Sequence, residues 1–190
     1  MKKLPIILMS IALIFTLAAC GSGQKTTKQT KQISLDNTVN EASLNYTISY
    51  PADWSYKVAE NNALVIQNAP PNPANVSIIN IQTYPTKSNG GTFSSAAEVI
   101  DSFKTTSADI GSNNEYFAEK DYVYTTEDGA QLVGRQIVVS MKDLGIHQKQ
   151  VVIPSADGKF LYHWSYSTTL ANYNNHIDAA EAMLASFKLK

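Results

Sequence analysis

Three histidines are the side chains best suited to acid–base or metal chemistry in this sequence, but their spacing does not group them. His147, His163 and His176 are separated by sixteen and thirteen residues. A zinc site needs three or four converging ligands, and none of its short signatures is present. We therefore expect neither a metal nor a cofactor. His163 is the candidate binding residue among the three. It lies beside Ser165 on the face of its predicted strand opposite to four aromatic residues, and it would line a cleft if that face is open.

Carboxylates cluster at two places, and a pair that flanks a cleft can perform general acid and base catalysis. The clusters are Glu119 with Asp121 and Glu127 with Asp128, both in or beside predicted turns, where acids are usually solvated. Nucleophilic catalysis is not indicated, because the sequence has no Gly-x-Ser-x-Gly elbow and no second cysteine. We therefore expect that the protein is not an enzyme.

Asp53 and Trp54 form a candidate binding pair. A tryptophan at the corner of a strand either fills the core or presents an exposed stacking surface, and the core role is favoured here. Asp53 is expected to accept hydrogen bonds from the amides of its turn. An enzymatic alternative would need Asp53, Glu127 and His163 to surround one open pocket.

Cys20 is the only cysteine, so it has no partner for a disulfide within the chain. It follows an apolar run from Leu4 to Thr16, and Lys2 and Lys3 precede that run. This order is typical of a secretory signal peptide, and the run is shorter than the roughly 20 apolar residues of a membrane-spanning helix.

The tetrad Leu17-Ala18-Ala19-Cys20 resembles the lipobox of bacterial lipoproteins. In such proteins the thiol receives a diacylglyceryl group carrying acyl chains such as palmitate, and a signal peptidase that recognises the preceding residues cleaves before the cysteine. The resemblance implies that residues 1–19 are a lipoprotein signal peptide and that Cys20 anchors the mature chain to the outer side of the cell membrane. Two acyl chains anchor stably, because each buried methylene contributes about 0.8 kcal/mol. The alternative is an ordinary signal peptide with an incidental cysteine.

Residues 20–37 are predicted to form the lipidated end and a flexible tether, because Gly, Ser, Gln, Thr and Lys dominate the segment. Its lysines, Lys25, Lys28 and Lys31, either rest on anionic headgroups or are simply solvated. Beyond them the chain carries ten basic and sixteen acidic side chains, a net charge of −6. Nucleic acid is therefore excluded as a partner, because phosphate binding requires clustered Lys and Arg.

Residues 38–190 are predicted to form one domain of the α+β class, with a mainly antiparallel sheet and helices packed on it. The predicted strands are 44–50, 55–59, 63–67, 76–84, 116–126, 130–141, 146–154 and 159–169. Apolar and polar residues alternate with a clean period of two in 44–50. The capping-box spacing of Ser95 and Glu98 predicts a helix that runs to about Ala108. Apolar residues at steps of four and three predict a second helix from about Asn172 to Phe187.

Two predicted strands indicate where the core lies. Segment 76–84 has apolar residues on both faces, which predicts a central strand that is covered on two sides. In segment 159–169, four aromatic residues share one face and are expected to belong to the core rather than to a binding site: Phe160, Tyr162, Trp164 and Tyr166.

This layout resembles the PsbP/Mog1-like superfamily. The resemblance is carried by Tyr50-Pro51-Ala52-Asp53-Trp54 and by the terminal helix that closes in Ser186-Phe187-Lys188, and the order of strands and helices between them agrees. It implies an α/β/α sandwich and a role in binding or assembly rather than catalysis. It implies no site residues, because no functional residue set of the superfamily can be matched here.

These observations together predict a membrane-anchored extracytoplasmic lipoprotein with a non-catalytic binding or accessory domain, whose partner is an envelope protein. Two alternatives remain open. One is an envelope enzyme with a site of scattered residues, and the other is a lipoprotein that binds a small ligand. An apolar cavity of several hundred cubic ångströms would favour the second alternative.

Overall fold

The computed structural model describes residues 33–71, 75–111 and 113–190, which belong to one compact unit. The predicted signal-peptidase recognition residues Leu17, Ala18 and Ala19 and the predicted lipidation site Cys20 lie outside the described residues. Within the described ranges, neither of the two helices has the length and the hydropathy that a membrane span requires.

Ten strands and two α-helices make up the described domain, and each lies within two residues of its prediction where one was made. They are β1 (Asn37–Val39), β2 (Tyr46–Tyr50), β3 (Trp54–Val58), β4 (Leu64–Asn68), β5 (Ile78–Pro85), α1 (Ala96–Ile110), β6 (Asn114–Thr125), β7 (Gln131–Met141), β8 (Ile146–Pro154), β9 (Phe160–Thr169), α2 (Tyr173–Ala185) and β10 (Lys188–Leu189). This composition confirms the α+β class.

Seven strands form the main sheet in the order β3-β4-β5-β9-β8-β7-β6, and every pair in it is antiparallel. The last four strands are consecutive hairpins, as the turn residues between them predicted. β5 lies between β4 and β9, so its predicted central position is confirmed.

A second, three-stranded sheet has the order β1-β2-β10, and it was not predicted. β1 and β10 contain only three and two residues, which is too short for a recognisable alternation. The chain already contacts the domain before β1, because Ile33 and Leu35 pack against the core. The last residues of the predicted tether, which was expected to end at Asn37, therefore lie on the folded domain.

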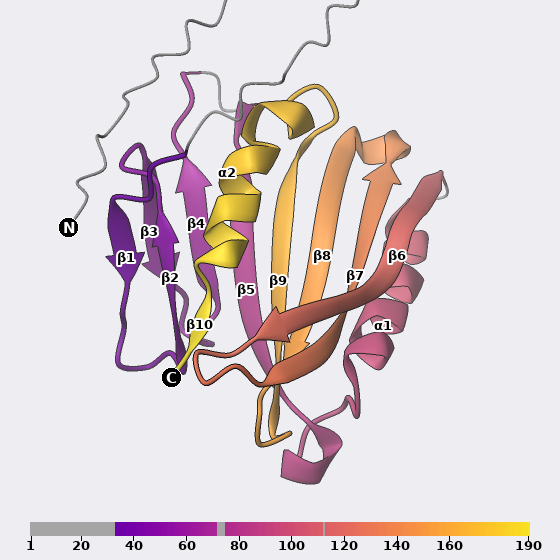
Figure 1. The fold of residues 1–190 in the computed structure, drawn as a ribbon. Helices are drawn as coiled ribbons and strands as arrows, with labels where there is room; N and C mark the ends of the chain where they lie inside the picture. The colour runs from indigo at the N-terminus through magenta and orange to yellow at the C-terminus, as the bar shows by residue number, and fades with distance from the viewer. Residues whose placement is uncertain (1–32, 72–74, 112) are drawn as a thin grey trace, which may run out of the picture. The chain divides into compact units, whose positions relative to one another are not determined.

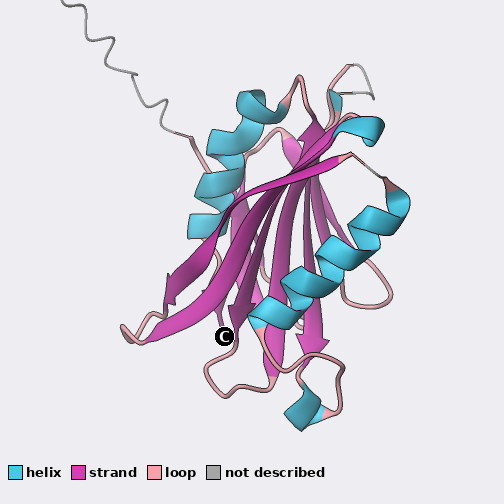
Figure 2. Ribbon diagram, turned by 90° about the vertical axis from the view of Figure 1, so that its right-hand side faces the viewer, coloured by secondary structure: helices cyan, strands magenta, loops and turns pink. Residues whose placement is uncertain are grey.

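The two α-helices pack against opposite faces of the main sheet, α2 in front of the strands in Figure 1 and α1 behind them (Figures 1 and 2). On the α2 face, Tyr162, Trp164 and Tyr166 are buried in the larger core, which confirms the predicted role of the aromatic stripe. On the α1 face, a smaller core contains Ala96, Val99, Ile100, Ile137, Val152 and Leu161.

Helix α1 begins at the predicted cap. Ser95 Oγ accepts a hydrogen bond from the Glu98 amide at 3.3 Å, as the capping-box spacing predicted. The Glu98 carboxylate accepts from the Ser94 amide at 2.8 Å, one residue earlier than in a regular capping box. These two bonds fix the start of the helix that covers the site described next.

Candidate functional site

A cleft of about 320 Å³ lies between α1 and the main sheet, and we call it the amide cleft. Its floor comes from β5, β9 and β8, and α1 supplies one wall. The lining residues are Asn80, Gln82, Tyr84, Phe93, Val99, Ser102, Phe103, Thr106, Gln148, Gln150, His163 and Ser165. None of these twelve residues is Asp, Glu, Lys or Arg.

The strand register explains why amide and hydroxyl groups meet on this floor. Asn80 on β5 lies opposite Ser165 on β9, and Ser165 lies opposite Gln150 on β8. In the next row on the same face, Gln82 lies opposite His163. Because side chains of adjacent antiparallel strands share a face at paired positions, five polar side chains converge under α1.

A directed series of hydrogen bonds crosses the floor. His163 Nε2 donates to Gln150 Oε1, since a carbonyl oxygen can only accept. Gln150 Nε2 donates to Gln148 Oε1 at 2.8 Å, and Gln148 Nε2 donates to Ser167 Oγ at 3.1 Å. Burial lowers the pKa of His163 to about 4, so the ring is neutral near pH 7. In this tautomer Nδ1 is a hydrogen-bond acceptor.

Asn80 provides an unused acceptor at the same place. Its side-chain oxygen Oδ1 is buried and has no hydrogen-bond partner among the described residues. Its backbone oxygen accepts from Ser165 Oγ at 3.4 Å. A buried acceptor that lacks a partner costs about 1–3 kcal/mol.

Aromatic rings flank the polar floor. Tyr84 and Phe93 pack edge to face with ring centroids 5.6 Å apart, and Tyr84 lies 6.0 Å from the His163 ring. The Tyr84 hydroxyl donates to Gln82 Oε1. Phe103 reaches the cleft from α1, so the cleft combines a polar floor with apolar sides.

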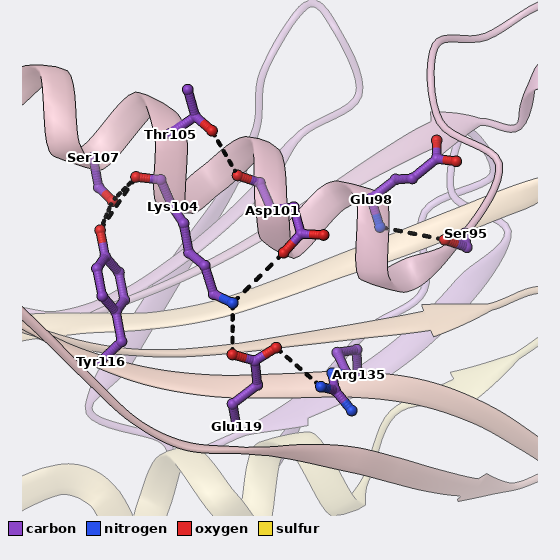
Figure 3. A network of polar contacts seen from close by, with 9 residues as sticks. All are labelled: Ser95, Glu98, Asp101, Lys104, Thr105, Ser107, Tyr116, Glu119 and Arg135. Atoms are coloured by element: carbon purple, nitrogen blue, oxygen red, sulfur yellow. Dashed lines mark hydrogen bonds and ion pairs between the residues drawn. The ribbon is translucent and has the colours of Figure 1, made fainter.

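An ion-pair network holds α1 against β6 and β7 (Figure 3). The Glu119 carboxylate is 2.5 Å from Lys104 Nζ on α1 and 3.0 Å from Arg135 Nη2 on β7. Arg135 also contacts Asp121 at 2.9 Å. The hydrogen bond from Lys104 lowers the pKa of Glu119. The expected position of these two acids in or beside a turn was wrong, because both lie within β6 and are paired across elements, although Asp121 remains largely exposed.

A second link lies one turn further along α1. The Tyr116 hydroxyl on β6 is 2.6 Å from Ser107 Oγ and donates to the Lys104 carbonyl at 3.2 Å (Figure 3). Together with the ion pairs, this link positions the C-terminal half of α1, which carries Phe103 and Thr106 to the amide cleft.

The structure separates the residues that the sequence singled out. His163 lines the amide cleft, as its position beside Ser165 indicated. Trp54 is only 6% exposed and its ring lies 5.9 Å from that of His176, so the favoured core role is confirmed and the ring presents no exposed stacking surface. Asp53 is exposed in the turn between β2 and β3.

Glu127 lies elsewhere again, in the turn between β6 and β7, and pairs with Lys188 at 2.8 Å. It lines a separate hollow of about 520 Å³ beside the turn between β8 and β9, together with Asp128 and Asp157. The three residues that the enzymatic alternative requires, Asp53, Glu127 and His163, therefore do not surround one pocket.

The remaining histidines are engaged in other places. His147 packs against Tyr173 with ring centroids 4.1 Å apart, and His176 Nδ1 is 3.0 Å from Ser77 Oγ. Among the residues that the structure describes, no group of three or more His, Cys, Asp or Glu side chains is arranged to hold a metal ion.

Most of the cleft could not be predicted while apolar side chains were expected on both faces of β5. In the structure Ile79 and Ile81 enter the larger core, whereas Asn80 and Gln82 lie on the face towards α1. This alternation is visible in the sequence. What the sequence does not show is that Gln148 and Gln150 of β8 lie two strands away on the same face.

Comparisons with known proteins identify the fold. No family model and no curated protein matches the sequence. Among solved structures, the solution structure of a cyanobacterial PsbP protein (CyanoP) from Synechocystis sp. PCC 6803 matches with a TM-score of 0.54 at 16% identity, over 81% of this chain and 92% of that one.

Two weaker structural matches were also found. A protein from Bacteroides thetaiotaomicron has a TM-score of 0.42 at 9% identity, over 83% of this chain and 49% of its own. A protein of unknown function from Pseudomonas aeruginosa has a TM-score of 0.45 at 12% identity, over 78% of this chain and 92% of its own. From the match to the cyanobacterial protein, the described domain has a PsbP-like fold.

Proposed function

We propose that this chain is a lipoprotein held by lipid on Cys20 at the outer side of the cell membrane, where its domain binds a partner without catalysing a reaction. The proposal includes the finer assignment of the domain to the Mog1/PsbP-like α/β/α sandwiches. That assignment is supported by the packing of α1 and α2 on opposite faces of the main sheet. The observation that carries the binding role is the amide cleft, a preformed concave site with an uncharged lining.

The chemistry of the cleft favours binding over catalysis. The imidazole of His163 donates to Gln150 Oε1 and has a pKa of about 4, so it is a weak base near neutral pH. The lining includes no carboxylate, ammonium or thiol that would form a nucleophile and base pair with it. Amides, hydroxyls and aromatic rings are instead the groups that orient a bound molecule.

The position of Cys20 limits where this binding takes place. Twelve residues separate Cys20 from Ile33, the first residue that packs on the domain. At about 3.5 Å per residue they span at most about 40 Å, so the domain stays close to the membrane surface. We therefore propose an envelope protein as the partner that the anchored domain meets.

Crosslinking in living cells tests the proposal. The lipidated protein would be crosslinked, purified from the membrane fraction and analysed by mass spectrometry, with the Cys20→Ser chain as the matched control. We expect a specific envelope protein in the wild-type sample and its loss from the control. Recovery of no specific protein across growth conditions would contradict the proposal, and equal recovery with Cys20→Ser would remove the role of the anchor.

A further inference from the structure

We infer that the amide cleft binds a small uncharged molecule with hydroxyl or amide groups, of the size of one sugar ring. The inference rests on the proposed binding function and adds a small ligand held in the amide cleft, distinct from the envelope protein that the anchored domain meets. It corresponds to the small-ligand alternative, but with a polar floor instead of the apolar cavity that was expected for it.

The absence of charge in the lining selects against ionic ligands. A carboxylate or ammonium that entered the cleft would lose water without gaining an ion-pair partner, because no lining residue is Asp, Glu, Lys or Arg. The imidazole does not supply a charge either, since burial lowers the pKa of His163 to about 4 and the ring is neutral near pH 7. An uncharged ligand avoids this desolvation cost.

The hydrogen-bond acceptors of the cleft that have no partner in the described part of the chain favour a ligand with donor groups. Asn80 Oδ1 is a buried acceptor with no partner among the described residues, and His163 carries a second acceptor at Nδ1 when Nε2 donates to Gln150. The floor side chains Gln150 and Gln148 are already bonded to each other, so their positions are fixed before a ligand arrives. A ligand with several O–H or N–H groups satisfies these acceptors.

The size and the sides of the cleft favour a ring. A volume of about 320 Å³ is at the small end of ligand sites, which cover about 300–1,000 Å³. Tyr84, Phe93 and Phe103 line the sides above the polar floor. A sugar ring matches this division, because its edge carries hydroxyls and its faces carry C–H groups.

Four compounds with one ring shape provide the test: glucose, N-acetylglucosamine, glucuronate and glucosamine. Each would be titrated by calorimetry into the full chain, purified in a detergent without a sugar headgroup. We expect saturable binding of glucose or N-acetylglucosamine at millimolar concentration or below. The anion and the cation are expected to bind at least about tenfold more weakly, because they would be buried unpaired.

Two cleft variants and one control locate the binding. Asn80→Leu removes the unused acceptor and is expected to weaken binding about tenfold while leaving the unfolding midpoint unchanged or higher. Ser102→Trp places a ring into the cleft from the exposed side of α1 and is expected to abolish binding. Gln67→Leu changes an exposed amide on β4 outside the cleft and should bind as the wild type does.

The inference is overturned if neither neutral compound binds, if a charged compound binds as well as the neutral ones, or if Asn80→Leu and Ser102→Trp bind normally. Failure of the inferred ligand class can be distinguished from failure of the proposed binding function. If the crosslinked envelope protein is still recovered with a chain that binds none of the four compounds, the ligand class is wrong and the proposed binding function stands.

Discussion

His163 on β9 donates a hydrogen bond from Nε2 to the side-chain oxygen of Gln150 on β8, its diagonal neighbour in the sheet. Gln150 Nε2 in turn donates to Gln148 Oε1, so one imidazole and two side-chain amides form a single series of hydrogen bonds. A floor that is bonded within itself needs little reorganisation when a ligand arrives. The state of this imidazole also makes the stability of the domain sensitive to pH.

The first prediction concerns acid. Burial lowers the pKa of His163 from 6.5 to about 4, so the unfolded chain binds a proton at a pH where the folded chain does not. The stabilisation is complete above about pH 6.5 and is lost as the pH falls towards about 4, on the order of 3 kcal/mol at most. His163→Gln should flatten this dependence.

Urea unfolding at about pH 7.5 and about pH 5 measures the effect. Burial also lowers the pKa of His147, so the His163→Gln chain keeps a smaller slope that His147→Gln should remove. An unchanged slope in His163→Gln would show that His163 is not held neutral by burial.

The second prediction concerns the ion pair between Lys149 on β8 and Glu181 on α2. The Lys149 side chain is only 11% exposed, whereas Glu181 is 45% exposed. Glu181→Gln should destabilise the domain by about 1–2 kcal/mol in urea unfolding, because it leaves a nearly buried ammonium without its partner. The exposed pair of Glu127 and Lys188 is the control, and Glu127→Gln should have no measurable effect. Equal effects of the two substitutions would contradict the role of burial.

The third prediction concerns Gly134 on β7. A Cβ at this position would lie 2.0 Å from the backbone oxygen of Val152 on the neighbouring strand, and a sheet backbone cannot move away cheaply. Gly134→Ala is expected to cost about 3 kcal/mol or to prevent folding, as circular dichroism and urea unfolding would show. Gly129→Ala is the comparison: Gly129 has φ +86° but nothing within 4 Å, so only the backbone strain of about 1 kcal/mol is expected.

The fourth prediction concerns Glu119, which joins α1 to β7 through Lys104 and Arg135. Glu119→Gln should lower stability by about 1 kcal/mol or less at low ionic strength, because the pairs are partly solvated. The difference from the wild type should shrink in high salt, which screens partly exposed charges. A difference of the same size at both ionic strengths would indicate lost packing instead of lost charge.

Local sequence patterns were sufficient for eight of the ten described strands, β2 to β9, and for both α-helices. The alternation in β2 and β9, the spacing of Ser95 and Glu98, and the apolar steps in α2 each depend on neighbours within a few residues. Such patterns predict the elements correctly because the same periodicity also determines which side chains are buried in the folded protein. The central position of β5 and the burial of Trp164 followed from the same reasoning.

The site depended on relations that a local pattern does not contain. The amide cleft requires Asn80 and Gln150 to share a row, and these residues are separated by seventy positions in the sequence and by β9 in the sheet. β10 also cannot be recognised from the local sequence, because its two residues form a strand only by pairing with β2. The pairing of Glu119 with Lys104 depends in turn on where α1 crosses the sheet.

The proposed attachment of lipid to Cys20 is the central claim about where the protein acts, and one measurement tests it directly. Cells that express the wild-type or the Cys20→Ser chain would be grown with radioactive palmitate, fractionated and probed for the protein. We predict label and membrane association for the wild type, and an unlabelled chain released from the membrane fraction for Cys20→Ser. Label or membrane association that persists in Cys20→Ser would contradict the account.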